Sequence, residues 1–161
     1  MLGIAVGDLR SRPVGAQQAV SLRVAAEDLP DLDLAAGLEA RGLATNLGDD
    51  GVKVELQVET VLQRPCARCL KDVRLPVRAD AEETFLDDGE TPITMETIDL
   101  QPIIREAVVL AEPMRVLCAP DCRGLCPQCG KDLNEGPCGC RDDDPDPRLA
   151  PLAKLLHPRE E

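Results

Sequence analysis

The chain has 161 residues and a formal net charge of −12, and Phe85 is its only aromatic residue. The acidic balance disfavours a general nucleic-acid binder, and a chain with a single aromatic ring lacks the usual platform for stacking bases. No apolar run approaches the roughly 20 residues that a membrane span needs, and no basic residue precedes the short apolar run at the start, as it would in a signal peptide. We therefore expect a cytoplasmic protein without a membrane partner.

The first third of the chain mixes strand and turn patterns. Residues 1–17 are interpreted as an irregular lead-in. Apolar and polar residues alternate over 20–24, which predicts a short half-buried strand. Residues 34–47 are rich in Ala and Leu but contain two glycines, so helix and strand both stay open and we favour a strand. Residues 46–51, Asn-Leu-Gly-Asp-Asp-Gly, predict a turn.

The clearest alternation runs over residues 52–62, where apolar residues fall on one face and charged or polar residues on the other. Residues 73–79 alternate again. Because Cys66 and Cys69 lie between these two runs, we expect a β-hairpin with a metal-binding turn at its tip. Pro76 indicates that the second strand lies at an edge or contains a bulge.

One helix is predicted after the strands. Residues 80–99 contain eight acids and no base, and we expect their later part to be a mobile loop. Asp99 can cap the helix that follows, and Pro113 ends it. The apolar residues of this segment keep the i, i+3, i+4 spacing of an amphipathic helix: Leu100, Ile103, Ile104, Ala107, Val108 and Ala111.

These patterns predict an α+β fold. An antiparallel β-sheet from about residue 18 to 86 packs with one main helix, and a C-terminal cysteine-rich zinc-knuckle segment follows. Residues 1–113 would form the β-rich core with its CxxC hairpin and helix, and residues 114–141 the zinc-binding segment. Residues 142–161 would form an acidic linker and a short amphipathic tail, all within one domain overall. The tail carries four leucines: Leu149, Leu152, Leu155 and Leu156.

Eight cysteines give the strongest chemical signal. In a reducing cytosol they are better interpreted as metal ligands than as disulfides. A redox dithiol at Cys66 and Cys69 would need a helix start within a βαβ unit, whereas strand patterns flank this pair on both sides. Six cysteines lie in residues 118–140, where Leu125 and Leu133 are the only large apolar residues. Metal binding can order a segment that has no core of its own.

Eight thiolates fit two closed four-cysteine sites, which are structural because no coordination position stays open. We favour one site of Cys126, Cys129, Cys138 and Cys140, and another of Cys66, Cys69, Cys118 and Cys122. The second set would fasten the exit of the helix to the hairpin tip. The alternative joins the first four cysteines of the C-terminal segment and pairs the last two with the hairpin. Two Zn²⁺ ions per chain are favoured over iron, because no redox partner is evident.

A basic patch surrounds the predicted tip, with only Asp72 opposing it: Arg64, Arg68, Lys71, Arg74 and Arg78. Arginine forks match phosphate oxygens, so the patch predicts RNA binding. The alternative is a set of solvated charges that balance the acidic loop.

No enzyme constellation is evident. His157 is the only histidine, and it lies near the tail. The aspartates of 142–144 are interpreted as a disordered acidic run, and neither a phosphate loop nor a Ser–His–acid set occurs. We expect neither catalysis nor a small-molecule substrate.

Four features occur in a fixed order over residues 18–156: the strand leading into Cys66-Ala-Arg-Cys69-Leu, the following Glu83-Thr-Phe85, the helix from Ile98 to Pro113, and the run Cys118-Ala-Pro-Asp-Cys122-Arg-Gly-Leu-Cys126-Pro-Gln-Cys129-Gly with the Asp146-Pro-Arg-Leu ending. In these features the chain resembles the YceD family, also called DUF177, the large ribosomal RNA subunit accumulation proteins. The resemblance implies a cytoplasmic, non-catalytic role in making or retaining 23S ribosomal RNA, with that RNA or the assembling large subunit as partner. The other class kept open is an acidic, zinc-stabilised interaction module that binds a basic partner such as a ribosomal protein or a nuclease.

Overall fold

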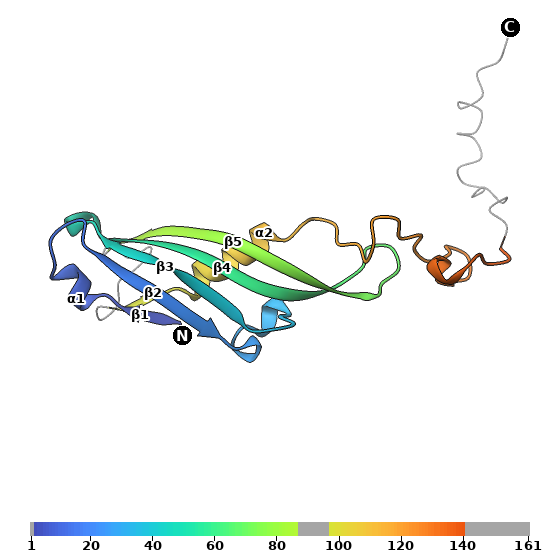
Figure 1. Ribbon diagram of the computed structural model, residues 1–161, viewed down its shortest axis with the longest axis horizontal. Helices are drawn as coiled ribbons and strands as arrows, with labels where there is room; N and C mark the ends of the chain where they lie inside the picture. Colours follow the sequence, from blue (N-terminus) through green and yellow to red (C-terminus); the bar gives the residue numbers. More distant parts are fainter. Residues whose placement is uncertain (1, 87–96, 141–161) are drawn as a thin grey trace, which may run out of the picture.

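A computed structural model describes residues 2–86 and 97–140. Four strands follow one another as an antiparallel meander in the order β2–β3–β4–β5: β2 (Gln17–Val24), β3 (Leu38–Asn46), β4 (Val52–Pro65) and β5 (Asp72–Phe85). Figure 1 shows this sheet at one end of an elongated molecule and the cysteine-rich loops at the other. The fold is therefore the predicted α+β class.

The long β4–β5 hairpin follows directly from the alternating sequence. Val52, Val54, Leu56 and Val58 are buried, and the polar residues that alternate with them face outward. The pairing runs from Val52 opposite Phe85 to Pro65 opposite Asp72, so both strands extend beyond the predicted runs and end at the Cys66 turn. β5 is an edge strand, which tolerates the missing N–H of Pro76.

Close approach of backbones requires glycine at two points of the sheet. A Cβ on Gly42 in β3 would lie 1.8 Å from the carbonyl oxygen of Glu55 in β4. Gly51, in the turn before β4, has φ of +92° and faces the carbonyl oxygen of Phe85. Gly42, which made residues 34–47 ambiguous, thus belongs to a strand of a tightly packed sheet.

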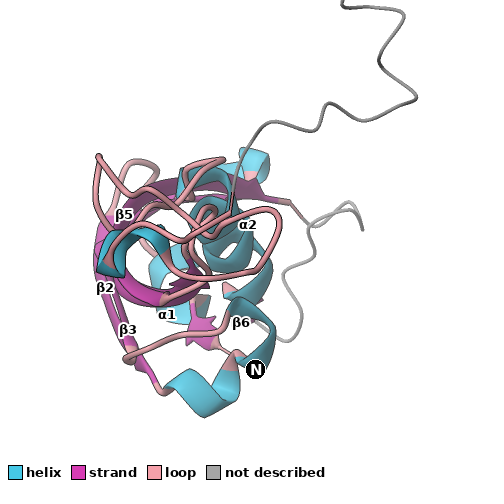
Figure 2. Cartoon of the chain, turned by 90° about the vertical axis from the view of Figure 1, so that its right-hand side faces the viewer, coloured by secondary structure: helices cyan, strands magenta, loops and turns pink. Residues whose placement is uncertain are grey.

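Helix α2 (Gln101–Ala111) packs mainly on β5 and β4, and the sheet curves around it (Figure 2). It buries Ile104, Ala107 and Val108 against the core. The N-cap residue is Leu100, one residue after the predicted Asp99, although the carboxylate of Asp99 accepts a hydrogen bond from the N–H of Gln101 at 3.0 Å. Among the described residues, no helix has the length and apolar character that crossing a membrane requires.

The irregular lead-in predicted for residues 1–17 is wrong. This segment forms β1 (Gly3–Ala5), helix α1 (Gly7–Arg10) and the start of β2, and β1 pairs antiparallel with β6 (Thr97–Asp99). Val6 and Leu9 are fully buried. The partner strand is more than 90 residues away in sequence, so local periodicity carries no sign of it. The middle of the predicted acidic loop, residues 87–96, and the leucine-containing tail lie outside the described residues.

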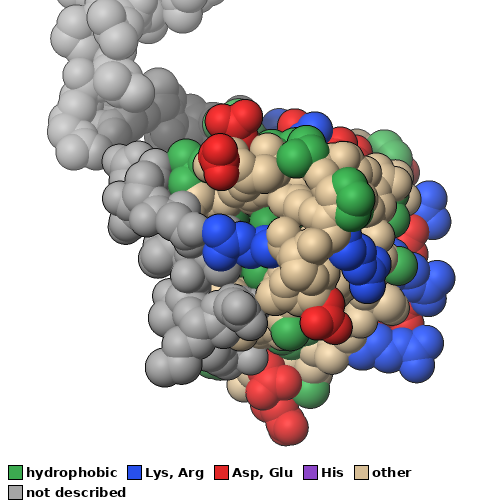
Figure 3. Space-filling view, turned by 90° about the vertical axis from the view of Figure 1, so that its left-hand side faces the viewer, with side chains coloured by type: hydrophobic (Ala, Val, Ile, Leu, Met, Phe, Trp, Pro, Cys, Tyr) green, Lys and Arg blue, Asp and Glu red, His purple; other side chains and the backbone are tan. Residues whose placement is uncertain are grey.

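Seen from the end opposite the cysteine clusters, basic and acidic side chains are interspersed over the described surface (Figure 3).

Candidate metal centres and basic tip

Two clusters of four cysteines lie beyond the sheet. The first joins the hairpin turn to the chain that leaves α2: Cys66, Cys69, Cys118 and Cys122. Their sulfur atoms all lie within 4.8 Å of one another. All of these side chains are buried except Cys118, and Val73, Leu117 and Leu125 pack around them.

The second cluster is local in sequence, within residues 126–140: Cys126, Cys129, Cys138 and Cys140. Its sulfur atoms also lie within 4.8 Å of one another. Cys126 is buried, whereas Cys129 and Cys140 are exposed. The two groups of four are those favoured from the spacing; that they hold metal stays a prediction.

The sulfur distances fit a tetrahedral thiolate site. The Sγ atoms of Cys66 and Cys122 are 3.8 Å apart, and those of Cys69 and Cys118 are 3.5 Å apart. A disulfide requires about 2.0 Å. Four thiolates at about 2.3 Å from one zinc ion lie about 3.8 Å from each other. The donor sets therefore suit a metal that prefers four sulfur ligands, which includes zinc and iron.

The two cysteine turns have the same backbone. In the hairpin, the N–H of Cys66 donates to the carbonyl of Lys71 at 2.8 Å, and the N–H of Leu70 donates to the carbonyl of Cys66 at 3.0 Å. Cys126, Gly130 and Lys131 repeat these two bonds at 2.8 and 2.9 Å. The residue after each pair is left-handed, with φ of +62° at Leu70 and +72° at Gly130. The second turn therefore has the glycine that this geometry favours, whereas the first holds an exposed leucine there.

Amide groups in each turn stabilise the thiolate of its first cysteine. The backbone N–H groups of Cys69 and Arg68 lower the pKa of the Cys66 thiol to about 6. The two equivalent N–H groups lower the pKa of Cys126 to about 6. These two sulfurs are therefore prepared to bind a cation as thiolates.

One exposed thiol in each group behaves in the opposite way. The sulfur of Cys69 is the main cause that raises the pKa of Cys118 to about 12, and the sulfur of Cys129 raises the pKa of Cys140 to about 12. Neighbouring thiolates repel one another, so four can ionise together only when a cation neutralises them. The residues present thus fit a divalent metal.

The predicted basic residues lie along the hairpin, but several are already engaged. Arg64 forms a two-pronged ion pair with Glu112, at 2.5 and 2.9 Å, and its side chain is 18% exposed. Lys71 contacts Asp132 at 2.7 Å and Glu135 at 3.6 Å. These two side chains join the hairpin to other parts of the fold.

Three other residues of the predicted basic patch leave most of their guanidinium N–H groups exposed to solvent. Arg68 uses Nη1 to bond the carbonyl of Cys122 at 2.6 Å, and the residue is otherwise exposed. Arg78 pairs with Glu59 at 3.1 Å on the open sheet face, where the arginine side chain is 85% exposed. Arg74 is exposed and has no partner among the described residues.

Two further arginines surround the tip and were not singled out from the sequence. Arg115 and Arg123 are exposed, and their side chains have no partner in the described part of the chain. Both lie close in sequence to a backbone hydrogen bond with the Cys66 turn. Near Arg115, the carbonyl of Val116 accepts from the N–H of Ala67. Near Arg123, the N–H of Leu125 donates to the carbonyl of Arg68. The favoured grouping of Cys118 and Cys122 with the hairpin already implied this proximity.

Comparison with known proteins places this region within a family. The family model described as "Large ribosomal RNA subunit accumulation protein YceD" matches residues 54–156, which include both cysteine clusters and the hairpin. Rv2926c of Mycobacterium tuberculosis is 38% identical over 123 residues, covering 70% of this chain and 59% of the relative. YlbN of Bacillus subtilis is 32% identical over 119 residues, covering 68% of this chain and 69% of that protein.

A plant protein carries the ribosomal description in its own name. "Large ribosomal RNA subunit accumulation protein YCED homolog 1, chloroplastic" of Arabidopsis thaliana is 33% identical over 64 residues, covering 40% of this chain and 20% of the relative. The chain spans about three fifths of the length of the Mycobacterium tuberculosis relative it matches. No solved structure matches it. Since the family model covers more than half of the sequence, the chain belongs to the YceD family.

Proposed function

We propose that this chain is a non-catalytic ribosome-biogenesis factor that acts in the cytoplasm and supports the synthesis, processing or stability of 23S ribosomal RNA. One Zn²⁺ ion in each cysteine cluster stiffens the hairpin tip, which contacts ribosomal RNA or the assembling large subunit. The family membership supports the ribosomal role. The observation that carries the proposed contact is the group of open arginines around a tip held by two cysteine clusters.

The zinc part rests on the closed four-thiolate sets. A metal with four protein sulfurs has no position for water or substrate, so its role is structural. Elemental analysis of protein purified without added metal should give two zinc ions per chain. A ratio near zero, with eight freely titrating thiols, would overturn this part.

The ion pairs seen in the structure change which basic residues we expect to contact phosphate. We define the tip arginines as Arg68, Arg74, Arg115 and Arg123. A guanidinium with open N–H groups can bond two phosphate oxygens at once, and a rigid support lowers the entropy lost on binding. Arg64 fits this role least, because both prongs of its guanidinium are held by Glu112.

Salt dependence of RNA binding tests the proposal. Each phosphate contact contributes roughly −0.7 to −0.9 to the slope of log affinity against log salt. The Arg74→Ala/Arg123→Ala variant should therefore lose about 1.4–1.8 units of slope in anisotropy titrations with 23S fragments. Arg64→Met is the control, since it removes one positive charge of the hairpin that Glu112 already holds, and it should keep the wild-type slope.

Two outcomes would reject the tip as the RNA site. One is an unchanged slope in the double variant. The other is wild-type protein that fails to bind the fragments at low salt. If the protein then captured a basic ribosomal protein in a salt-dependent way, its charge of −12 would favour the acidic interaction module instead.

A further inference from the structure

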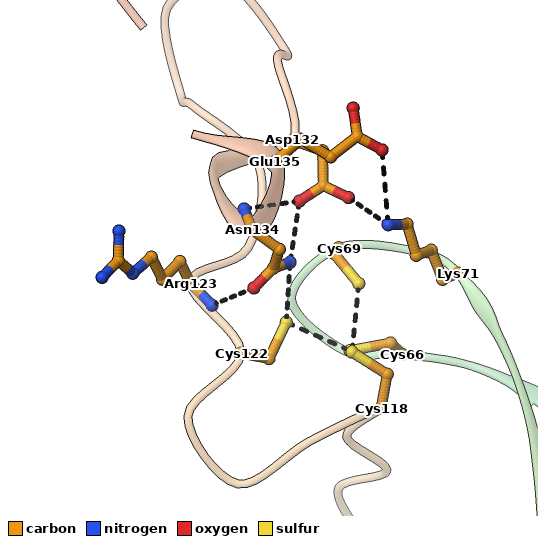
Figure 4. A network of polar contacts seen from close by, with 9 residues as sticks. All are labelled: Cys66, Cys69, Lys71, Cys118, Cys122, Arg123, Asp132, Asn134 and Glu135. Carbon is orange, nitrogen blue, oxygen red and sulfur yellow. Dashed lines mark hydrogen bonds and ion pairs between the residues drawn. The ribbon is translucent and has the colours of Figure 1, made fainter. Parts of the chain in front are cut away.

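The loop that closes the second cysteine cluster lies on the first. Residues 131–135 lie within the connection from Cys129 to Cys138, so any metal in the second cluster holds this loop from both sides. Within it, Asn134 Nδ2 donates to the sulfur of Cys122, a member of the first cluster, at 3.4 Å (Figure 4). An amide of one cluster's loop thus contacts a sulfur of the other cluster.

The Asn134 amide has a fixed orientation. Asp132 Oδ1 accepts from Asn134 Nδ2 at 2.7 Å and from its backbone N–H at 2.8 Å. On the other side, Asn134 Oδ1 accepts from the N–H of Arg123 at 2.8 Å (Figure 4). The amide oxygen must face the N–H donor of Arg123, and the amide nitrogen must face the carboxylate acceptor of Asp132. Only one orientation of the amide meets both requirements, and it directs an N–H at the Cys122 sulfur.

An ion pair and backbone bonds fasten the same loop to the hairpin. Lys71 Nζ lies 2.7 Å from Asp132 Oδ2, and the Asp132 side chain is only 12% exposed. The Lys71 side chain lowers the pKa of that carboxyl. Behind it, the N–H of Leu133 donates to the carbonyl of Gly124 at 2.9 Å. A Cβ on Gly124 would lie 3.0 Å from the carbonyl oxygen of Arg68, so the two turns are in close contact.

We propose that the two metal sites are thermodynamically coupled and that Asn134 is the positioning residue that couples them. Metal in the second cluster holds the 131–135 loop, and the loop directs the Asn134 N–H at the Cys122 thiolate. Four thiolates around one divalent ion leave two excess negative charges, which an N–H donor stabilises. Coupling between binding sites is reciprocal, so metal in the first cluster strengthens binding at the second by the same factor. This inference rests on the proposal that both clusters hold a divalent metal.

The two cysteine turns supply a matched pair of lysines. Lys71 and Lys131 occupy the same position, two residues after the second cysteine of each turn. Lys71 reaches across to Asp132 in the other cluster's loop, whereas Lys131 Nζ bonds the carbonyl of Pro137 within its own loop at 3.0 Å. Lys71→Met therefore removes a link between the clusters, and Lys131→Met removes the same charge and leaves that link in place.

Cobalt(II) titration of the full chain against a competing chelator tests the coupling, because cobalt–thiolate bands report the metal's ligand environment. Wild-type protein should take up two Co²⁺ ions. In Asn134→Leu the product of the two association constants should fall about 10- to 100-fold, the usual effect of losing an outer hydrogen bond to a metal ligand. The charge-transfer band of the first cluster should shift as well. Lys71→Met should lower the same product, and Lys131→Met should lower it less.

A variant without the second site separates coupling from local damage. Cys138→Ser/Cys140→Ser retains only the first cluster, so adding Asn134→Leu to it should change the cobalt affinity far less than in the full chain. Asn134→Asp keeps the acceptor for Arg123 and removes the donor to Cys122, and it should weaken cobalt binding at least as much as leucine.

The outcomes distinguish the two proposals. Wild-type protein that binds fewer than two cobalt ions would overturn the metal sites themselves. Wild-type protein that binds two, with unchanged affinities and bands in Asn134→Leu and Asn134→Asp, would overturn the coupling alone.

Discussion

The ion pair between Arg64 and Glu112 joins the end of β4 to the end of α2, just before the chain enters the first cysteine cluster. We predict that Glu112→Gln destabilises the fold, since it leaves the guanidinium with only the more distant carboxylate of Asp33, 3.9 Å away. Arg64 also donates to the carbonyl of Leu32 at 3.1 Å, so the arginine connects three segments. Its hydrogen bonds to Glu112 raise the pKa of Arg64, so the guanidinium stays charged.

The size of the effect follows from geometry and burial. The side chains are 18% and 23% exposed, so water competes for the pair only in part. A hydrogen bond to a charged group contributes about 1.5–3 kcal/mol, whereas an exposed ion pair contributes about 0.2–1 kcal/mol. This pair is mostly buried and belongs near the low end of the first class, so we expect a coupling of about 2 kcal/mol. That corresponds to a loss of about 4–8 °C in Tm for a chain of this length.

A double-mutant cycle with Arg64→Met, Glu112→Gln and the combined variant measures this coupling by urea unfolding. Arg78→Met is the control, because its pair with Glu59 is 85% and 60% exposed and should contribute less than about 0.5 kcal/mol. The reasoning is refuted if the combined variant loses as much unfolding free energy as the two single variants together. It is also refuted if Arg78→Met lowers the unfolding free energy as much as Arg64→Met.

Three further outcomes are expected. Leu62→Ala should cost about 2–4 kcal/mol in urea unfolding, because the side chain is 0% exposed, and a loss below about 1 kcal/mol would contradict this packing. Gly51→Ala should lower the free energy of unfolding clearly more than Gly130→Ala. A Cβ at Gly51 would lie 2.0 Å from the Phe85 carbonyl oxygen, whereas a Cβ at Gly130 would have nothing within 4 Å. Equal losses of stability would show that the sheet can shift to make room at Gly51. A chelator should increase hydrogen exchange first in residues 118–140, and Cys69→Ser should increase hydrogen exchange around Cys118. If chelator increased exchange earlier in β4 and β5, metal would not be what orders residues 118–140.

The sequence by itself determined the elements whose pattern is local. Alternation over 52–62 and 73–79 predicted β4 and β5, because a half-buried strand repeats every two residues. The i, i+3, i+4 spacing after Asp99 predicted α2 in the same way. The spacing of the eight cysteines also favoured the two groups of four that the structure brings together. In each case the information lies within a few residues or in an uncommon residue type.

Only the tertiary structure decided which basic side chains are open. Arg64 and Arg74 look alike in the sequence, yet one is held by Glu112, 48 residues away, and the other is exposed without a partner among the described residues. The link from Asn134 to Cys122 also crosses between the two clusters and leaves no periodic trace. The same holds for β1, whose pairing strand β6 closes the other end of the fold. Contacts of this kind depend on how the chain folds back on itself, and local spacing records the period of an element, not its distant partner.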